Sequence, residues 1–280
     1  MQNKNITIIK ASGEKVDFSS KKVATSLKRA GATEEMVQWI LNKIEEELYV
    51  GISTKEIYNR AFNLLKKKNS FIASKYKLKK AIYELGPTGF PFEKFVAAIL
   101  KNTGYKVEIG QILQGACVSH EIDVMAQKDG ELFLIECKFH SLEGSNCDVK
   151  VPLYIDSRYR DIVRFNAQKA KKKLPIKQGW VVTNTRFTED ALAYGKCSCL
   201  HLLSWDYPKG KAIKDQIDST GLYPITVSTL LTSREKQFLL SRDVVLCLEL
   251  INDHFFLDHL GISDTRKEKI LKEMESLCKH

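Results

Sequence analysis

The feature that most constrains the fold is the alternation of strand-like and helix-like segments across residues 86–205. A helical pattern at 92–104 precedes three strand-like runs, at 105–113, 119–127 and 131–138. The remaining expected elements are a helix at 156–173, a buried strand at 179–184, a helix at 188–197 and a strand at 200–205. Strands interleaved with helices indicate an α/β layer built on a mixed sheet. We therefore expect a mixed sheet flanked by helices in this region.

The segments on either side of this region have different patterns. Short β-like runs at 6–10 and 14–18 flank a turn, and helical periodicity follows them. The expected helices lie at 19–31, 34–48, 53–68 and 70–85. The Gly- and Pro-rich stretch 86–91 marks a boundary, and from about residue 229 onward only short helical stretches are expected. The sequence thus predicts a multidomain α/β chain in three parts, at 1–85, 86–224 and 225–280, the last of them small and all-α.

Charge is unevenly distributed along the chain. The 280 residues carry a formal charge of +10, and residues 1–85 hold 17 Lys and Arg against 9 Asp and Glu. A basic first segment suggests a polyanionic partner, although a solvated basic helix face would give the same count. The seven cysteines are scattered and odd in number, which favours a reducing, cytoplasmic location. No apolar run approaches the roughly 18–20 residues of a membrane span, so we expect no membrane partner.

Charged side chains stand in the second and third strand-like runs. Asp123 lies in the second run, and Glu136 and Lys138 flank Cys137 at the end of the third. Adjacent strands of a hairpin would bring the two carboxylates together, and such hard oxygen ligands suit Mg²⁺ or Mn²⁺. Because strand side chains alternate, Lys138 would project beside Glu136, where a lysine can orient or deprotonate a water, while Cys137 would point to the packed face. An ordinary amphipathic hairpin with its charges in water would show the same spacing.

The runs "HEIDVMA" and "ELFLIECKFH" resemble the core of the PD-(D/E)xK nuclease superfamily, in its Mrr-like restriction-endonuclease branch. "FEKFVAAILKNTGYKVE" is similar to the helix that precedes that core. The resemblance covers about residues 86–205 and implies that Asp123 and Glu136 bind the metal. It also implies a catalytic lysine at Lys138 and an accessory acid at Glu93. Isoleucine replaces the proline of the family's PD dipeptide here.

Residues near this core are candidates for DNA contact. The candidates on the expected helix are Arg158, Arg160, Arg164, Gln168 and Lys169. The cations among them would hold DNA phosphates, and the resemblance implies a polar residue such as Gln168 facing the site. A solvated helix face explains the lysines at 171–173 equally well. Glu121 shares a strand face with Asp123 and is either a further active-site acid or a residue of the rim.

Residues 1–85 resemble an ATP cone, the small nucleotide-binding regulatory module best known from ribonucleotide reductases. The match rests on "ITIIKASGEKVDFSSKKVATSLKRAG", "ISTKEI" and "FIASKYKLKKAI". The resemblance implies that ATP or dATP binds as a regulatory ligand, with Lys10, Lys22 and Lys80 at the phosphates, Thr54 and Tyr58 near the base or sugar, Tyr76 lining the pocket, and Ile8 and Val23 as apolar wall. Ala11 stands where the family commonly has a basic residue. A degenerate cone, kept as a dimerising or DNA-docking scaffold, is the alternative.

The part at 225–280 resembles a helix-hairpin-helix at "LGISDTRKEKILKEMESL", and a packing or self-association module fits equally well. Together these patterns predict a Mg²⁺-dependent DNA endonuclease, regulated by ATP or dATP and active in restriction or defence. DNA and an adenine nucleotide are the expected partners, and one site per chain favours a homodimer or higher homo-oligomer. The alternatives are a nucleotide-responsive DNA-binding regulator with an inactive nuclease fold, and a nuclease that acts on RNA.

Overall fold

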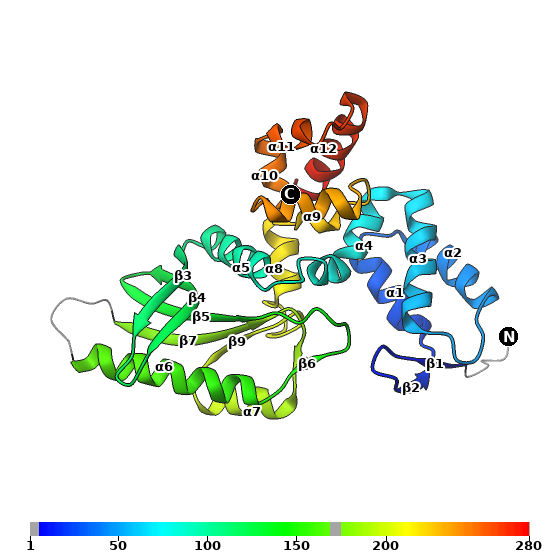
Figure 1. Cartoon of the computed structure of the whole chain (residues 1–280). Helices are drawn as coiled ribbons and strands as arrows, with labels where there is room; N and C mark the ends of the chain where they lie inside the picture. The colour runs from blue at the N-terminus through cyan, green and yellow to red at the C-terminus, as the bar shows by residue number, and fades with distance from the viewer. Residues whose placement is uncertain (1–5, 169–174, 280) are drawn as a thin grey trace.

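The computed structural model describes residues 6–168 and 175–279 (Figure 1). Its first part is an antiparallel hairpin of β1 (Thr7–Ile9) and β2 (Lys15–Asp17), followed by four helices. The helices are α1 (Ser20–Arg29), α2 (Glu34–Glu46), α3 (Thr54–Lys68) and α4 (Ser70–Tyr83). Side chains cap three of these helices: Thr33 accepts from the amide of Met36, and Ser53 and Asn69 act in the same way on α3 and α4. Apolar faces of the helices meet in a core of their own that includes Leu27, Ile40, Ile44 and Leu65.

A five-stranded mixed sheet forms the centre of the molecule. Its strands, in spatial order, are β3 (Lys106–Gln114), β4 (Ser119–Lys128), β5 (Glu131–Lys138), β7 (Ile176–Thr183) and β9 (His201–Leu203). Strand β4 runs antiparallel to both of its neighbours, β3 and β5, whereas β5, β7 and β9 are parallel. The predicted fold class is therefore confirmed. A second, two-stranded parallel pair, β6 (Asn146–Cys147) with β8 (Arg186–Phe187), was not expected from the sequence.

The turn between β4 and β5 fixes which residues face each other. Asp129 and Gly130 have φ angles of 52° and 77°, which is the two-residue geometry that Asp-Gly favours in hairpins. The register that follows pairs Val124 with Ile135. Continued by one residue, this register places Asp123 opposite Glu136.

Helices cover both faces of the sheet (Figure 1). On one face α5 (Phe90–Asn102) packs with Val124, Ala126 and Ile135 in the largest core. The other face is covered by α6 (Lys150–Gln168) and α7 (Glu189–Cys197). The helix expected at 156–173 thus begins earlier, at Lys150, and the expected positions 169–173 lie outside the described residues.

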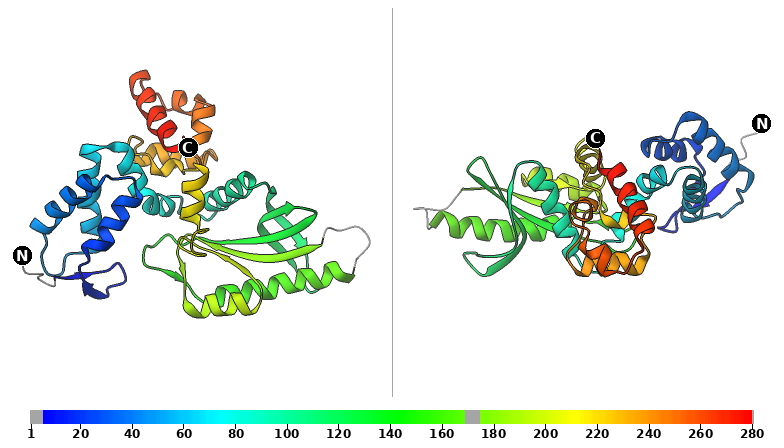
Figure 2. Two further views of the ribbon diagram at one scale, coloured as in Figure 1. Left: turned by 180° about the vertical axis from the view of Figure 1, so that it is seen from behind. Right: turned by 90° about the horizontal axis from the view of Figure 1, so that it is seen from above.

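The C-terminal helices sit above the junction between the first part and the sheet (Figure 2). They are α8 (Ile213–Thr220), η1 (Ile225–Val227), α9 (Ser233–Ser241), α10 (Cys247–Asn252), α11 (Phe255–His259) and α12 (Asp264–Cys278). Their apolar side chains join the largest core, which runs without a break from Leu78 and Ile82 of α4, past Phe95 of α5, to Ile270 of α12. Within the described ranges, no helix has both the length and the apolar character needed to cross a membrane.

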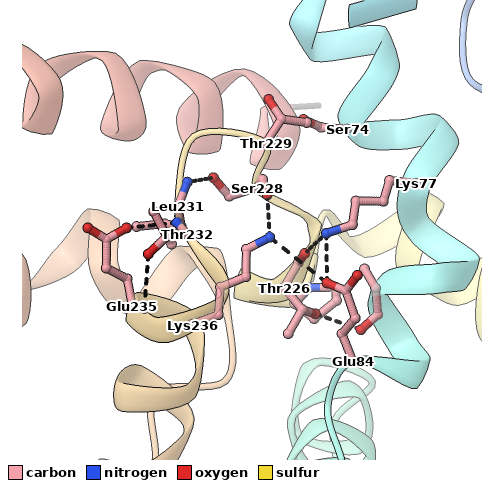
Figure 3. Close-up of polar contacts among 12 residues, drawn as sticks. Ser74, Lys77, Glu84, Thr226, Ser228, Thr229, Leu231, Thr232, Glu235 and Lys236 are labelled. Carbon is pink, nitrogen blue, oxygen red and sulfur yellow. Dashed lines mark hydrogen bonds and ion pairs between the residues drawn. The ribbon is translucent and has the colours of Figure 1, made fainter. Parts of the chain in front are cut away.

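Buried charged side chains also join α4 to the C-terminal helices (Figure 3). Nζ of Lys77 lies 2.7 Å from Oε2 of Glu84 and donates to the carbonyl oxygen of Thr226 at 2.9 Å. Nζ of Lys236 donates to the carbonyl oxygen of Ser228 at 2.6 Å. Because buried charges are tolerated only when they are paired or hydrogen-bonded, these contacts fix the position of the tail on α4.

Glu273 of α12 accepts hydrogen bonds from both sides of the same junction. Its carboxylate accepts hydrogen bonds from the hydroxyl of Ser74 at 2.7 Å and from that of Ser228 at 2.5 Å. It also accepts the backbone amide of Thr229 at 2.9 Å and the hydroxyl of Thr229 at 2.7 Å. With four donors, this side chain is fully satisfied although it is only 6% exposed.

Candidate functional site

Three carboxylates predicted from the sequence gather at one end of the sheet. Asp123 and Glu136 each lie one residue beyond the paired residues Val124 and Ile135 of β4 and β5. Oδ2 of Asp123 accepts the backbone amide of Cys137 at 2.7 Å, which ties the aspartate to the neighbouring strand. Glu93 reaches the same place from the first turn of α5, which a proline near its start helps to begin. The charge of Asp123 influences the ionisation of both Glu136 and Glu93, and the charge of Glu136 influences that of Glu93.

Burial, with a smaller effect from neighbouring carboxylates, raises the pKa values of all three carboxyl groups. The pKa of Glu136 rises to about 7, mainly because the group is buried and then because Asp123 lies close by. The pKa of Glu93 also rises to about 7, through burial first and then through the charges of Asp123, Glu136 and Glu121. Burial raises the pKa of Asp123 against the opposing effect of its hydrogen bond from Cys137. Negative charge is therefore crowded and incompletely compensated at this end of the sheet.

Lys138 lies at the exposed end of β5, two residues after Glu136. Its backbone carbonyl accepts the hydroxyl of Thr183 at 2.7 Å, so the strand end is held by β7. Burial raises the pKa of Asp123, and the charge of Lys138 is among the influences that lower it. Cys137 packs against the largest core, and burial raises the pKa of its thiol. The predicted alternation of these side chains agrees with this placement.

Arg158 of α6 completes the set of charges. Its Nη1 lies 2.7 Å from Oε1 of Glu136, and its Nη2 donates to the carbonyl oxygen of Glu121. The guanidinium also stacks over the ring of Tyr154, 5.4 Å from the centroid. Sequence reasoning assigned Arg158 to DNA phosphates and missed its ion pair with a carboxylate. Spacing along the chain gives no signal for it, because the pair depends on how α6 docks onto the sheet.

The other DNA-contact candidates lie elsewhere on α6. Arg160 is 66% exposed and pairs with Asp156 at 2.9 Å. Arg164 and Gln168 are exposed, and Gln168 ends the helix ten residues beyond Arg158. At 1.5 Å per residue this separation is about 15 Å, so Gln168 is not brought to the carboxylates. Lys169 lies outside the described residues.

The donor set at the sheet end is compatible with a magnesium ion. Across the described ranges, no group of three or more His, Cys, Asp or Glu side chains is arranged to hold a metal ion. Magnesium needs fewer protein ligands, since it is commonly bound by one or two carboxylates together with water and substrate phosphate. Asp123 and Glu136 offer two hard oxygen donors, and their crowded negative charge would be relieved by a cation. The residues present therefore fit the ion that the sequence predicted.

A second candidate site is a cavity of about 400 Å³ beside the β1–β2 hairpin. Four of the residues predicted to bind nucleotide line it, namely Lys10, Thr54, Tyr58 and Lys80. Nζ of Lys80 lies 5.9 Å from the centroid of the Tyr58 ring. The volume falls within the range of roughly 300–1,000 Å³ typical of small-molecule sites.

The other four predicted nucleotide residues do not line this cavity. Ile8, Val23 and Tyr76 belong to the core of the first part, where Tyr76 stacks on Tyr58 with ring centroids 5.2 Å apart. Lys22 is exposed on α1. Four further charged residues that sequence reasoning missed share the cavity: Glu14, Lys79, Glu143 and Arg186. Only Lys79 carried a signal, since it is adjacent to Lys80.

Two family matches define the class of this protein. Residues 6–84 match the ATP cone domain, and residues 87–206 match the restriction endonuclease domain. An ATP cone domain therefore precedes a restriction endonuclease domain, as the sequence predicted.

The particular family follows from matches that extend to the C-terminal helices. Residues 223–278 match a family described as AF1548-like, C-terminal. An uncharacterized protein of Archaeoglobus fulgidus is 31% identical over 183 residues, which are 99% of that protein and 65% of this chain. A crystal structure described as a protein of unknown function, AF1548, has 29% sequence identity and a TM-score of 0.56, and the match covers 98% of that chain and 68% of this one. The chain belongs to the AF1548-like family.

Proposed function

We propose that this protein is a metal-dependent endodeoxyribonuclease whose activity is regulated by ATP or dATP bound to the cone. The observation that supports the proposal most directly is the meeting of Asp123, Glu136 and Glu93 at one end of the sheet. Their raised pKa values favour a cation at this place. The restriction endonuclease match covers the same segment. A role in restriction or defence would fit these features.

The proposed roles follow from where each side chain stands. Asp123 and Glu136 would hold Mg²⁺ or Mn²⁺, which when bound supplies a water of lowered pKa and charge for the phosphate oxygens. Lys138, exposed beside these acids, would position the attacking water or offset charge that builds up on the phosphate. Glu93, with a pKa of about 7, is suited to exchange a proton near neutral pH.

A cleavage assay on the purified full-length chain tests the proposal. Supercoiled and linear DNA are incubated with Mg²⁺, with Mn²⁺ or with EDTA, each with and without ATP or dATP. Cleavage that needs the metal and changes with nucleotide is the expected result. DNA binding without any product under every condition would instead identify a nucleotide-responsive DNA-binding regulator, and cleavage confined to RNA would identify a ribonuclease.

Two parts of the proposal concern the protein as a whole. Because each chain offers one such site, cutting both strands of a duplex favours a homodimer or higher homo-oligomer, which light scattering with and without DNA would detect. All seven cysteines are free thiols, which suits a cytoplasmic protein.

A further inference from the structure

The cavity beside the β1–β2 hairpin is not built by the cone alone. Thr185, Arg186 and Trp205, all from the restriction endonuclease domain, form part of its wall. The loop that leaves β5 and leads to β6 forms another part, through residues 143–146. Gly144 of this loop approaches the hairpin so closely that a Cβ added to it would lie 3.5 Å from the Cβ of Ala11. A ligand in the cavity would therefore touch both domains at once.

Positive charge from both domains converges on this cavity. The cone contributes Lys10, Lys79 and Lys80, and the restriction endonuclease domain contributes Arg186. Burial lowers the pKa of Lys79, and the charge of Arg186 lowers it further. Nε of Arg186 lies 2.6 Å from Oδ2 of Asp206, but its side chain is still 63% exposed, which leaves its terminal nitrogens accessible. Lys10 pairs with Glu14, a carboxylate of the same lining, at 2.7 Å. The cations still outnumber the carboxylates Glu14 and Glu143 by four to two, which suits a polyphosphate, and Arg186 can offer two parallel donors to one phosphate.

Two further features of the cavity indicate a ligand of mixed chemistry. The hydroxyl of Tyr58 is buried and, among the described residues, has no hydrogen-bond partner. Trp205 lines the cavity but is only 5% exposed, so Tyr58 supplies the aromatic surface that suits a planar base. Both features are typical of a nucleotide site and not of a site for inorganic phosphate alone.

Glu143 places a negative charge in the same basic surroundings. It lies in the exposed loop after β5. Its charge opposes the lowering of the Lys79 pKa by burial, and it adds to the rise that burial causes in the pKa values of Tyr58 and Tyr83. Without nucleotide, a carboxylate at this position attracts Lys79, but it would repel the phosphates of a bound nucleotide. Binding would therefore push this loop away from the cavity.

The wall of the cavity is connected by hydrogen bonds to the catalytic strand. Asn146 of the loop pairs with Arg186 in the β6–β8 ladder. Asn184, two residues before Arg186, accepts the amide of His140 and donates to its carbonyl, both at 2.8 Å. Thr183 donates to the carbonyl of Lys138 at 2.7 Å. The segment 183–186 thus contacts the cavity at one end and the last residue of β5 at the other.

From these observations we propose that the restriction endonuclease domain completes the nucleotide site. Arg186 binds the terminal phosphates of a nucleoside triphosphate held by the cone, and displacement of Glu143 shifts the loop that follows Lys138. This inference rests on the proposed function, because it assumes that the cone binds nucleotide. It adds the residues through which the nucleotide reaches the catalytic strand.

Binding measurements on the full-length chain, without DNA or metal-dependent cleavage, test the first part. Arg186→Ala should weaken binding of ATP by about tenfold or more, because a charged hydrogen-bonding partner is lost, and should leave binding of adenosine unchanged. Arg234→Ala, which removes an exposed arginine of the C-terminal helices, is the matched control and should bind ATP like the wild type. Arg186→Lys, which keeps the charge, should retain part of the affinity and guards against a folding defect in the alanine variant.

Glu143→Gln tests the repulsion. We expect several-fold tighter binding of ATP, whereas Glu108→Gln, the same change at an exposed residue of β3, should have no effect. Hydrogen exchange then tests the connection: ATP should alter exchange in residues 139–147 of the wild type. Exchange that changes only within residues 6–85, or equal ATP affinity of Arg186→Ala and Arg234→Ala, would overturn the inference while leaving the proposed function intact. A wild-type chain that binds neither ATP nor dATP would instead overturn nucleotide regulation itself.

Discussion

Nη1 of Arg158 lies 2.7 Å from Oε1 of Glu136, while Nη2 of the same guanidinium donates to the carbonyl oxygen of Glu121. One side chain of α6 therefore bridges the ends of β4 and β5. The bridge holds Glu136 in place and opposes the burial that raises its pKa. Arg158 thus acts on the carboxylates first, and any contact with DNA comes in addition.

Removing Arg158 should shift the pH dependence of cleavage. Burial and Asp123 already raise the pKa of Glu136 to about 7, and Arg158 is the main influence in the opposite direction. In Arg158→Gln the pKa should rise further, so that the charged carboxylate forms only at higher pH and the acidic limb of the rate profile moves upward by about one pH unit. The measurement is the cleavage rate at saturating DNA between pH 6 and pH 9. Arg160→Gln, two residues along the same exposed helix, should alter DNA affinity alone, and an unmoved profile in Arg158→Gln would contradict this role.

Neutralising either predicted metal ligand should abolish metal-dependent cleavage. Asp123→Asn keeps an oxygen that can accept the amide of Cys137, so the hairpin should survive while the charge is lost. We expect a rate loss of roughly 10³-fold or more, which corresponds to about 4 kcal/mol of lost transition-state stabilisation. Glu136→Gln should behave in the same way. Circular dichroism verifies the fold, Glu108→Gln serves as the control, and wild-type rates in either variant would refute the assignment.

Glu93→Gln should stabilise the metal-free protein at high pH. The folded-state pKa of Glu93 is about 7, above its ordinary value, so the folded protein binds the proton more tightly than the unfolded chain does. The associated stability is fully present below about pH 4.5 and is lost as the pH rises through 7. Glutamine stays neutral, so the variant should be more stable than the wild type at pH 8 by about 1 kcal/mol, since the side chain keeps partial contact with water. At pH 4.5 the two should unfold alike.

Urea unfolding in EDTA measures this difference. Saturating Mg²⁺ should reduce the difference in stability between Glu93→Gln and the wild type at pH 8. The ion binds only the folded state and offsets the repulsion between Glu93 and the neighbouring carboxylates, so it stabilises the wild type more. Equal stability of the variant and the wild type at pH 8 in EDTA would show that burial and the neighbouring charges do not raise the pKa of Glu93.

Glu273 is expected to be essential for docking the tail. Its carboxylate accepts four hydrogen bonds from Ser74, Ser228 and Thr229, so Glu273→Ala leaves buried donors without an acceptor. We expect a loss of about 3 kcal/mol or more in the free energy of unfolding. Glu275→Ala, on the same helix but 46% exposed, should cost less than about 0.5 kcal/mol. A similar urea midpoint for the two variants would exclude this role for the buried carboxylate.

The sequence predicted the features that depend on local rules. Two neighbouring strand-like runs were enough to predict that Asp123 and Glu136 would come together across a hairpin, and helical periodicity located most of the helices. Contacts that depend on docking were not accessible in this way. Arg158 resembles any basic residue of an exposed helix until α6 is packed on the sheet, and Glu273 resembles a surface acid until α12 meets α4. The two-residue strands β6 and β8 are too short to leave a pattern in the sequence.

The unbroken core beneath the tail has a consequence for how the parts move. Only six residues separate the end of α4 at Tyr83 from the start of α5 at Phe90. Phe139 fills the space beside them so tightly that a Cβ on Gly86 would lie 2.7 Å from its ring. The connection between the cone and the restriction endonuclease domain is therefore short and tightly packed. A rotation of the cone would therefore move α5, the helix that carries Glu93. Inserting a few flexible residues at 86–89 should uncouple the motion of the cone from that of α5 and leave the fold of each domain intact.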